Sequence, residues 1–382
     1  MDFELTDQQE LLRHTVRSWS EREMAPLMAA AELDGRFPVS LYPRLGELNL
    51  LCSSIPAEFG GAGLDLISEC ILTEELGRIS SAFTASVMVH SGVATSAICR
   101  HGGLTLKRRL LPGAVRGRMI AAFALTEADA GSDAAAIRTR AVARDGEYTL
   151  HGNKSFITNG SIADFVTVAA VTDATARRGH GISLFVVERN TPGFRVGQRY
   201  DKAGNRAADT VELIFEHCTV PAENLIGQVN EGFGYLIESL TSGRVLHAAR
   251  SLGVARAAFE KALAYAKQRE AFGKKIGSFQ AIAFRLSTMS CQIDASQWLT
   301  YHAAWLIDRG LPCTRQAATA KLVASQTAEH VTGSAMHILG GAGYMREGEV
   351  ERLWRDAKLF PITEGSTEIQ QMIIARELGL DI

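Results

Sequence analysis

A carboxylate late in the sequence has the surroundings of a catalytic base. Glu364 lies in the run PITEGSTEIQ, residues 361–370, directly before a segment with helical spacing of apolar residues. Thr367 and Gln370 have the spacing of a capping box, which predicts a helix N-terminus at Thr367. The apolar residues before Glu364 would desolvate its carboxylate and raise its pKa toward neutrality, as a general base requires. The alternative is an acid that only complements the helix dipole.

Three regions of different periodicity must position this carboxylate. Residues 1–118 carry apolar residues at helical spacing, and residues 227–382 return to long helical patterns typical of an up-and-down bundle. Between them, residues 119–226 contain short apolar runs separated by turns, which favours an antiparallel barrel or sandwich over a doubly wound sheet. The predicted fold class is therefore α+β: an N-terminal helical domain, a middle antiparallel β domain and a C-terminal four-helix-bundle domain.

Local signals predict the individual elements. Thr6 and Gln9 form a capping box before the first helix, and Pro26 is expected to end or kink that helix. A turn at residues 151–153 is expected to divide 148–158 into a hairpin. Further strands are predicted at 120–125, 165–171, 182–187 and 211–220, a proline-glycine break at 112–113, and long helices at 245–268, 280–308 and 315–339.

Bulk properties exclude several classes of function. The formal net charge of −2 gives no basic excess for nucleic acid or an anionic membrane. No uninterrupted apolar stretch reaches the ~18 residues of a membrane span, and the first residues lack the pattern of a signal peptide. The six cysteines form no CxxC pair, so neither a metal site nor a disulfide framework is indicated. We therefore expect a cytoplasmic protein with reduced thiols.

Six motifs give the chain a resemblance to a known family. They are FALTEADAGSD at 123–133, FITNG at 156–160, REAFGK at 269–274, FQ at 279–280, ILGGAGY at 338–344 and the run around Glu364. In this order they resemble the acyl-CoA dehydrogenase family, of the short- and medium-chain kind, over essentially the whole length. The family's fold agrees with the helix–sheet–helix outline. The resemblance implies FAD as cofactor and Glu364 as the catalytic base.

The resemblance also assigns residues to the cofactor and the substrate. It implies substrate binding by Ser132, Arg244 and Gly365. The residues that it implies for FAD are Phe123, Leu125, Thr126, Gly131, Ser132, Phe156, Ile157, Thr158, Arg269, Phe272, Phe279, Gln280, His337, Ile338, Leu339, Gly340, Gly341, Ser366, Thr367 and Glu368. Without the resemblance, simpler interpretations stand: a local turn around Ser132, a core aromatic at Phe156, and a helix-dipole cation at Arg269.

The sequence departs from the family pattern at a few positions. Phe156 replaces a common tryptophan, His337 a common glutamine, and Thr241 an acidic residue three positions before Arg244. A minority of the family places its base one residue before that arginine. This chain has Gly243 there, which cannot act as a base, so Glu364 is favoured.

The predicted reaction is α,β-dehydrogenation of an acyl thioester. Glu364 would remove the α-proton, and FAD would accept the β-hydrogen as hydride. The family implies an electron-transferring flavoprotein as acceptor and a homotetramer. Three alternatives stay open: a dehydrogenase of a carrier-protein-bound acyl group, a flavin oxidase or monooxygenase, and a catalytically silent scaffold.

Overall fold

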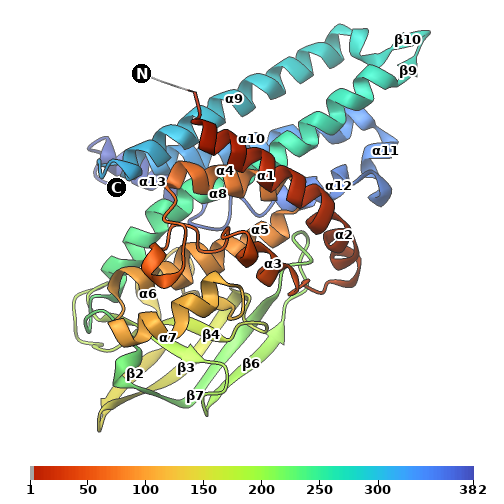
Figure 1. Cartoon of the computed structure of the whole chain (residues 1–382). Helices are drawn as coiled ribbons and strands as arrows, with labels where there is room; N and C mark the ends of the chain where they lie inside the picture. The colour runs from red at the N-terminus through yellow and green to blue at the C-terminus, as the bar shows by residue number, and fades with distance from the viewer. Residues whose placement is uncertain (1–3) are drawn as a thin grey trace.

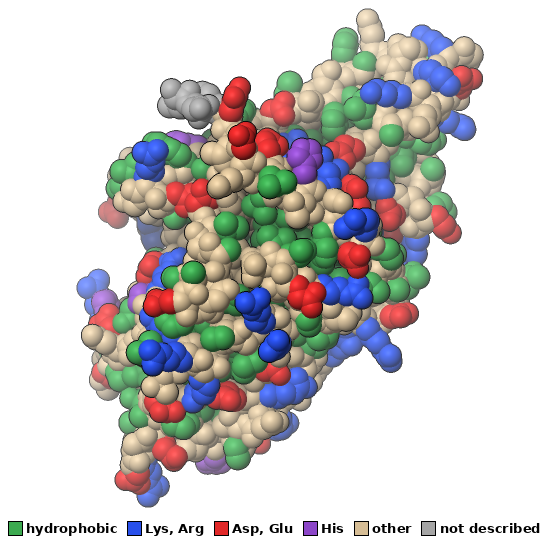
Figure 2. All heavy atoms as spheres, viewed as in Figure 1, with side chains coloured by type: hydrophobic (Ala, Val, Ile, Leu, Met, Phe, Trp, Pro, Cys, Tyr) green, Lys and Arg blue, Asp and Glu red, His purple; other side chains and the backbone are tan. Residues whose placement is uncertain are grey.

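The computed structural model describes residues 4–382. In chain order, a first set of helices is followed by the strands of one sheet and then by a second set of helices (Figure 1). In space the sheet occupies one end of the molecule and the long helices α9 (Gln280–Asp308) and α10 (Thr314–Leu339) the other, with the N-terminal helices between them (Figure 1). The helix α8 (Gly232–Gln268) begins beside β5 (Ile182–Glu188) of the sheet and runs to the far end. Acidic and basic side chains are interspersed over the face seen in Figure 2, in keeping with the small net charge. The predicted fold class is confirmed.

The N-terminal helices differ from the prediction at both prolines. Their bounds are α1 Asp7–Trp19, α2 Ala25–Asp34, α3 Leu41–Glu47, α4 Leu66–Ile79, α5 Ser81–Met88, α6 Thr95–His101 and α7 Leu104–Val115. The capping box at Thr6 and Gln9 is present. Pro26 does not end the first helical segment, because the π-helical turn Ser20–Met24 leads into α2 and Pro26 lies in its first turn, where no N–H is needed. Pro112 likewise lies inside α7, which ends three residues later.

One eight-stranded sheet forms the middle of the chain. Its strands are β1 Ala121–Ala124, β2 Arg140–Arg144, β3 Glu147–Thr158, β4 Phe165–Val171, β5 Ile182–Glu188, β6 Phe194–Arg199, β7 Thr210–Pro221 and β8 Leu225–Ile226. The order is β6-β7-β3-β2-β4-β5-β8, with β1 paired to β4. All pairs are antiparallel except β1–β4 and β2–β4.

The predicted hairpin at 148–158 is wrong, because β3 is a single strand through this range. Its glycine marks a register shift against β7 between Leu150 and Gly152, and a second shift follows between Lys154 and Ile157. Gly152 is required because an added Cβ would lie 2.7 Å from the backbone Cα of Thr139. The glycine is a signal of close backbone approach within a strand.

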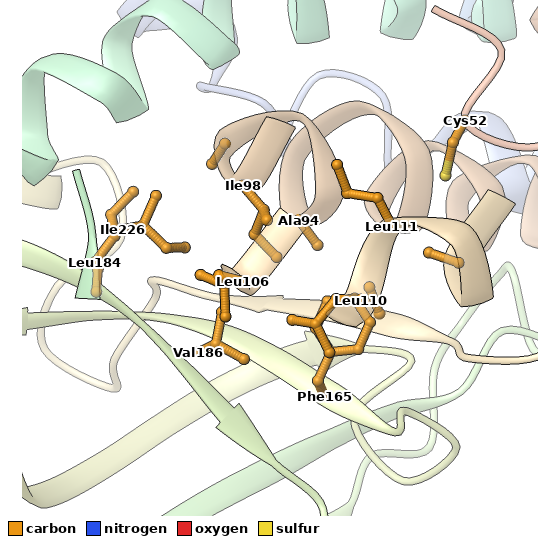
Figure 3. Close-up of a cluster of buried hydrophobic side chains, with 14 of the residues drawn as sticks. Cys52, Ala94, Ile98, Leu106, Leu110, Leu111, Phe165, Leu184, Val186 and Ile226 are labelled. Carbon is orange, nitrogen blue, oxygen red and sulfur yellow. The ribbon is translucent and has the colours of Figure 1, made fainter. Parts of the chain in front are cut away.

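Apolar side chains fix the N-terminal helices on the sheet. Ile98 of α6 and Leu110 and Leu111 of α7 pack in one buried cluster with Phe165 of β4 and Val186 of β5 (Figure 3). The alternate residues of the same two strands, such as Val166 and Phe185, belong to a second buried cluster with β3 and β7. Burial on both faces explains why β4 and β5 read as continuous apolar runs.

The C-terminal helices are long and alanine-rich where they pack. Their bounds are α8 Gly232–Gln268, α9 Gln280–Asp308, α10 Thr314–Leu339, α11 Gly341–Tyr344, α12 Val350–Ala357 and α13 Thr367–Glu377. The sequence predicted α9 and α10 closely, but α8 begins at Gly232 rather than near Val245. Between α8 and α9 the short strands β9 Glu270–Ala271 and β10 Lys274–Lys275 form a projecting hairpin (Figure 1).

One helical stretch, Ser81–His101, is long and apolar enough to qualify by composition as a membrane span. It contains α5, α6 and the π-helical turn between them. Because 72% of its most apolar window is buried inside the protein, we interpret it as part of the core.

Candidate active site

Glu364 lies in the loop between α12 and α13, just before the first turn of α13. The helix cap differs from the prediction by one residue. Ser366, and not Thr367, is the N-cap: its backbone is extended and its hydroxyl accepts from the Ile369 N–H at 3.4 Å, while Thr367 is already helical. Gln370 therefore does not complete a capping box.

The side chain of Gln370 instead holds the backbone of the Glu364 loop. Glu364 has φ 56° and Gly365 has φ 85°, so two successive residues adopt the left-handed conformation. Gln370 Nε2 donates to the carbonyl oxygens of Glu364, at 3.0 Å, and Gly365, at 2.9 Å. Lys321 Nζ of α10 donates to the same Gly365 oxygen at 2.7 Å. These bonds fix a strained loop in one conformation.

The Glu364 carboxylate lies against Gly243 of α8. A Cβ added to Gly243 would lie 3.1 Å from Glu364 Oε2, so the two positions compete for the same space. Oε2 is buried and has no hydrogen-bond partner among residues 4–382. Burial raises the pKa of Glu364, and the nearby charges of Arg244, Lys321 and Arg250 only partly oppose this rise. A buried, unpaired carboxylate with a raised pKa has the properties of a general base.

Two of these cations, Lys321 and Arg244, are themselves desolvated. Burial lowers the pKa of Lys321 to about 8, against the attraction of Glu364. Burial likewise lowers the pKa of Arg244, whose Nε is buried and has no partner within residues 4–382. Unpaired buried polar groups are costly for folding, so Glu364 and Arg244 mark a place where a ligand can supply the missing partners.

A second group of candidate residues, called the sheet-edge group below, lies where the end of β3 meets the loop that follows β1. Gly131 and Ser132 are exposed in the loop after β1, and Phe156 is 60% exposed at the bulged end of β3. The Ser155 N–H donates to the Thr126 carbonyl oxygen at 2.8 Å, so the loop and the bulge are in direct contact. An exposed ring beside exposed backbone and hydroxyl groups fits a flat heterocycle with polar edges, which is what the flavin ring of FAD presents.

A third group lies at the tip of the α8–α9 hairpin, at the far end of the molecule from the sheet (Figure 1). Phe272 is 95% exposed with φ 51°, and its ring meets that of Phe279 edge-on at 6.1 Å. Arg269 and Gln280 are exposed beside them. His337 to Gly341 lie at the end of α10, where Gly340 has φ 60°. One chain therefore does not bring the tip residues to the sheet-edge group.

The sequence reasoning missed Lys154 and Lys321 as residues that position the site, and it gave Gln370 only a capping role. Each is completely buried, although two of them carry a long cationic side chain. The available signal for Lys154 was the alternation along β3, in which it follows Tyr148, Leu150 and Gly152 on the same face. Such a lysine is almost never fully buried unless it has a specific partner.

The family models for the acyl-CoA dehydrogenase N-terminal, middle and C-terminal domains match residues 6–118, 122–218 and 230–379. The chain belongs to the acyl-CoA dehydrogenase family. It is thus an oxidoreductase of a family of FAD-dependent flavoproteins. The chain is 42% identical over 374 residues to an acyl-CoA dehydrogenase of Bacillus subtilis (strain 168), covering 98% of each protein.

Two solved structures superpose on the whole chain. A chain from the structure of the electron transferring flavoprotein of Acidaminococcus fermentans has a TM-score of 0.97 at 38% identity. Butyryl-CoA dehydrogenase from Megasphaera elsdenii has a TM-score of 0.96, also at 38% identity. Both cover 100% of this chain and 100% of their own.

Proposed function

We propose that this acyl-CoA dehydrogenase family member oxidises a short-chain acyl-CoA to its trans-2-enoyl-CoA, with Glu364 as the base. The observation that carries the proposal is the setting of Glu364: a buried carboxylate without a partner, held against Gly243 by a clamped loop. The short-chain preference rests on the similarity to butyryl-CoA dehydrogenase.

The first step is removal of the substrate's α-proton by the Glu364 carboxylate. The raised pKa of Glu364 suits this task, because it brings the base closer to the weak acidity of the α-carbon. When bound, FAD supplies the acceptor for the hydride that leaves the β-carbon, so that a carbon–carbon double bond forms. The proton remains on Glu364 until it exchanges with solvent.

The thioester carbonyl must be polarised while negative charge develops on its oxygen. The backbone N–H of Glu364 is available, because no acceptor for it exists among residues 4–382. Gln370 and Lys321 bind the carbonyl oxygens of Glu364 and Gly365, which fixes the backbone that directly follows this N–H. We assign Gly365 and Arg244 to the thioester and its arm, with Ser132 on the other side.

The flavin ring would lie on Phe156 and Thr158, with its polar edge at Thr126, Gly131 and Ser132. Phe123, Leu125 and Ile157 support these residues, while Ser366, Thr367 and Glu368 would approach from α13. Because the tip residues Arg269, Phe272, Phe279 and Gln280 lie far from the sheet edge, we assign them to the FAD of a neighbouring subunit, together with His337, Ile338, Leu339, Gly340 and Gly341. This arrangement requires an oligomer, and we propose a homotetramer.

The proposal also covers the electron acceptor and the domain boundaries. We propose an electron-transferring flavoprotein as the electron acceptor. This agrees with the similarity to a chain from the structure of the electron transferring flavoprotein of Acidaminococcus fermentans. We also propose domain boundaries after residues 118 and 226.

The test is the Glu364→Gln variant, which keeps the volume of the side chain and removes the base. We expect FAD to remain bound while turnover of butyryl-CoA falls ~10²-fold or more. Glu69→Gln is the matched control, because burial also raises the pKa of Glu69, on α4, outside the proposed site. Near-normal turnover by Glu364→Gln would refute the assignment of the base.

A carrier-protein thioester is the second candidate substrate. Thr241 stands where the family pattern has an acid, and its hydroxyl donates to the Ile237 carbonyl oxygen at 3.1 Å within α8. In this proposal the thiol carrier would meet a neutral side chain at this point. Turnover of butyryl-CoA compared with the same acyl group on an acyl-carrier protein distinguishes the two substrates.

A further inference from the structure

A buried ion pair lies between β3 and the loop that follows β1. Lys154 of β3 is completely buried, and its Nζ lies 2.8 Å from Glu127 Oε1. Burial lowers the pKa of Lys154 to about 8, and the charge of Glu127 opposes that change. Replacing such a pair by apolar residues of similar volume is often neutral or stabilising, so stability alone does not explain why the pair is present.

The pair ties both ends of one loop, residues 125–139, to the same strand. At the beginning of the loop, Lys154 Nζ also donates to the Leu125 carbonyl oxygen at 2.9 Å. At its end, Glu127 accepts from the N–H groups of Arg138, at 2.6 Å, and Thr139, at 2.9 Å. Without this carboxylate, two backbone N–H groups would lose their acceptor, so it specifies the loop conformation.

The strand that carries Lys154 is irregular at this point. Lys154 pairs with Leu213 of β7 and Ile157 with Val211, so β3 has one extra residue over this interval. The bulge frees the Ser155 N–H for the Thr126 carbonyl oxygen and turns Phe156 outward with φ 60°. The loop and the bulge are therefore built on one set of hydrogen bonds centred on Lys154.

We propose that Lys154 and Glu127 are positioning residues for the flavin. They hold the exposed loop apex, Gly131 and Ser132, and the outward ring of Phe156 as one preformed surface. This inference rests on the proposed function, since the apex and Phe156 are its flavin contacts. A surface ordered before binding loses less conformational entropy when the cofactor arrives, which raises affinity.

The test combines two measurements on the purified holoenzyme of the wild type and of Lys154→Met. The first is the FAD dissociation constant, which we expect to rise about 10-fold or more because cofactor binding must then order the loop. The second is the rate of tryptic cleavage after Arg138, divided by the rate after Arg144. Both arginines are exposed, but only Arg138 belongs to the loop, so global unfolding changes both rates and loss of loop order raises the ratio.

Thr167→Val is the matched control for lost stability. Thr167 is buried in β4, and its hydroxyl donates to the Ala94 carbonyl oxygen at 3.0 Å rather than to the loop. We expect this variant to keep the wild-type cleavage ratio and FAD affinity. If Lys154→Met fails to fold, Glu127→Gln takes its place, because an amide of nearly equal volume leaves one of the two backbone N–H groups unpaired.

The proposal requires both the higher cleavage ratio and the weaker FAD binding. It is overturned if either quantity stays at the wild-type value, or if Thr167→Val shows the same changes. A wild-type protein that binds no FAD would instead refute the proposed function, and the cleavage ratio would still decide whether the ion pair orders the loop.

Discussion

Replacing Gly243 by alanine is expected to displace the Glu364 carboxylate and slow turnover. The new Cβ would lie 3.1 Å from Glu364 Oε2 and 3.8 Å from Cδ. The first distance is shorter than an ordinary contact, so the carboxylate must move by a few tenths of an ångström. It cannot relax freely, because Gln370 and Lys321 hold the backbone on which it stands.

The size of the effect follows from the geometry of proton abstraction. Misplacement of a reacting group by 1 Å can cost ~10²-fold in rate, so a shift of a few tenths should lower kcat about 3- to 10-fold. The free energy of unfolding should not fall in parallel. Gly243 lies inside α8, where alanine is preferred to glycine by about 1 kcal/mol.

The assay is steady-state turnover of butyryl-CoA by the FAD-loaded variant, with a thermal unfolding curve beside it. Gly333→Ala is the matched control, since Gly333 lies inside α10 and its Cβ would be 4.0 Å from the nearest atom, Trp354 Cδ1. We expect Gly333→Ala to keep wild-type kcat. If Gly243→Ala also kept wild-type kcat, the carboxylate would not act from the position described.

Three further predictions concern pH, the cofactor and the helix cap. Because burial raises the pKa of Glu364, kcat/KM should fall on the acid side at a pH above the usual range of a glutamate, measured as a pH–rate profile. By linkage, the same raised pKa makes the protein less stable as the pH rises from the usual pKa of a glutamate to the raised pKa of Glu364. Glu364→Gln should remove this pH-dependent contribution. Phe272→Ala should weaken FAD binding about 10-fold in a cofactor titration with little change in the Tm of the FAD-free protein, because the ring is 95% exposed in the single chain, whereas Leu104→Ala should change neither. Ser366→Ala should lower the free energy of unfolding by about 1 kcal/mol in urea and raise the rate of hydrogen exchange in α13, and an unchanged exchange rate would contradict its role as the cap.

The sequence predicted those elements whose signals are local. The α9 and α10 helices carry helical periodicity over most of their length, and β4 and β5 are continuous apolar runs. The structure places these elements and β7 close to the expected bounds. The predictions at Pro26 and Gly152 were wrong because proline usually ends a helix and glycine usually marks a turn, whereas here neither residue interrupts its element. A π-helical turn accommodates Pro26, and a bulge accommodates Gly152.

The site was predictable in its residue types but not in its supports. A motif places Glu364 before a helix, yet nothing local reveals that Lys321, 43 residues earlier, binds the next carbonyl oxygen. The partnership of Lys154 with Glu127 is equally non-local, since 27 residues separate them. Contacts across such separations are set by the packing of strands and helices, which a single sequence does not specify. The roles assigned to the candidate site residues stay predictions.

The most direct measurement of the central claim is an anaerobic titration of the purified protein with butyryl-CoA, followed in the visible flavin band. The account predicts a yellow wild-type protein whose band bleaches as the thioester is added. It predicts a Glu364→Gln variant that is equally yellow and does not bleach. A colourless wild-type protein, or bleaching of the variant at the wild-type rate, would contradict it.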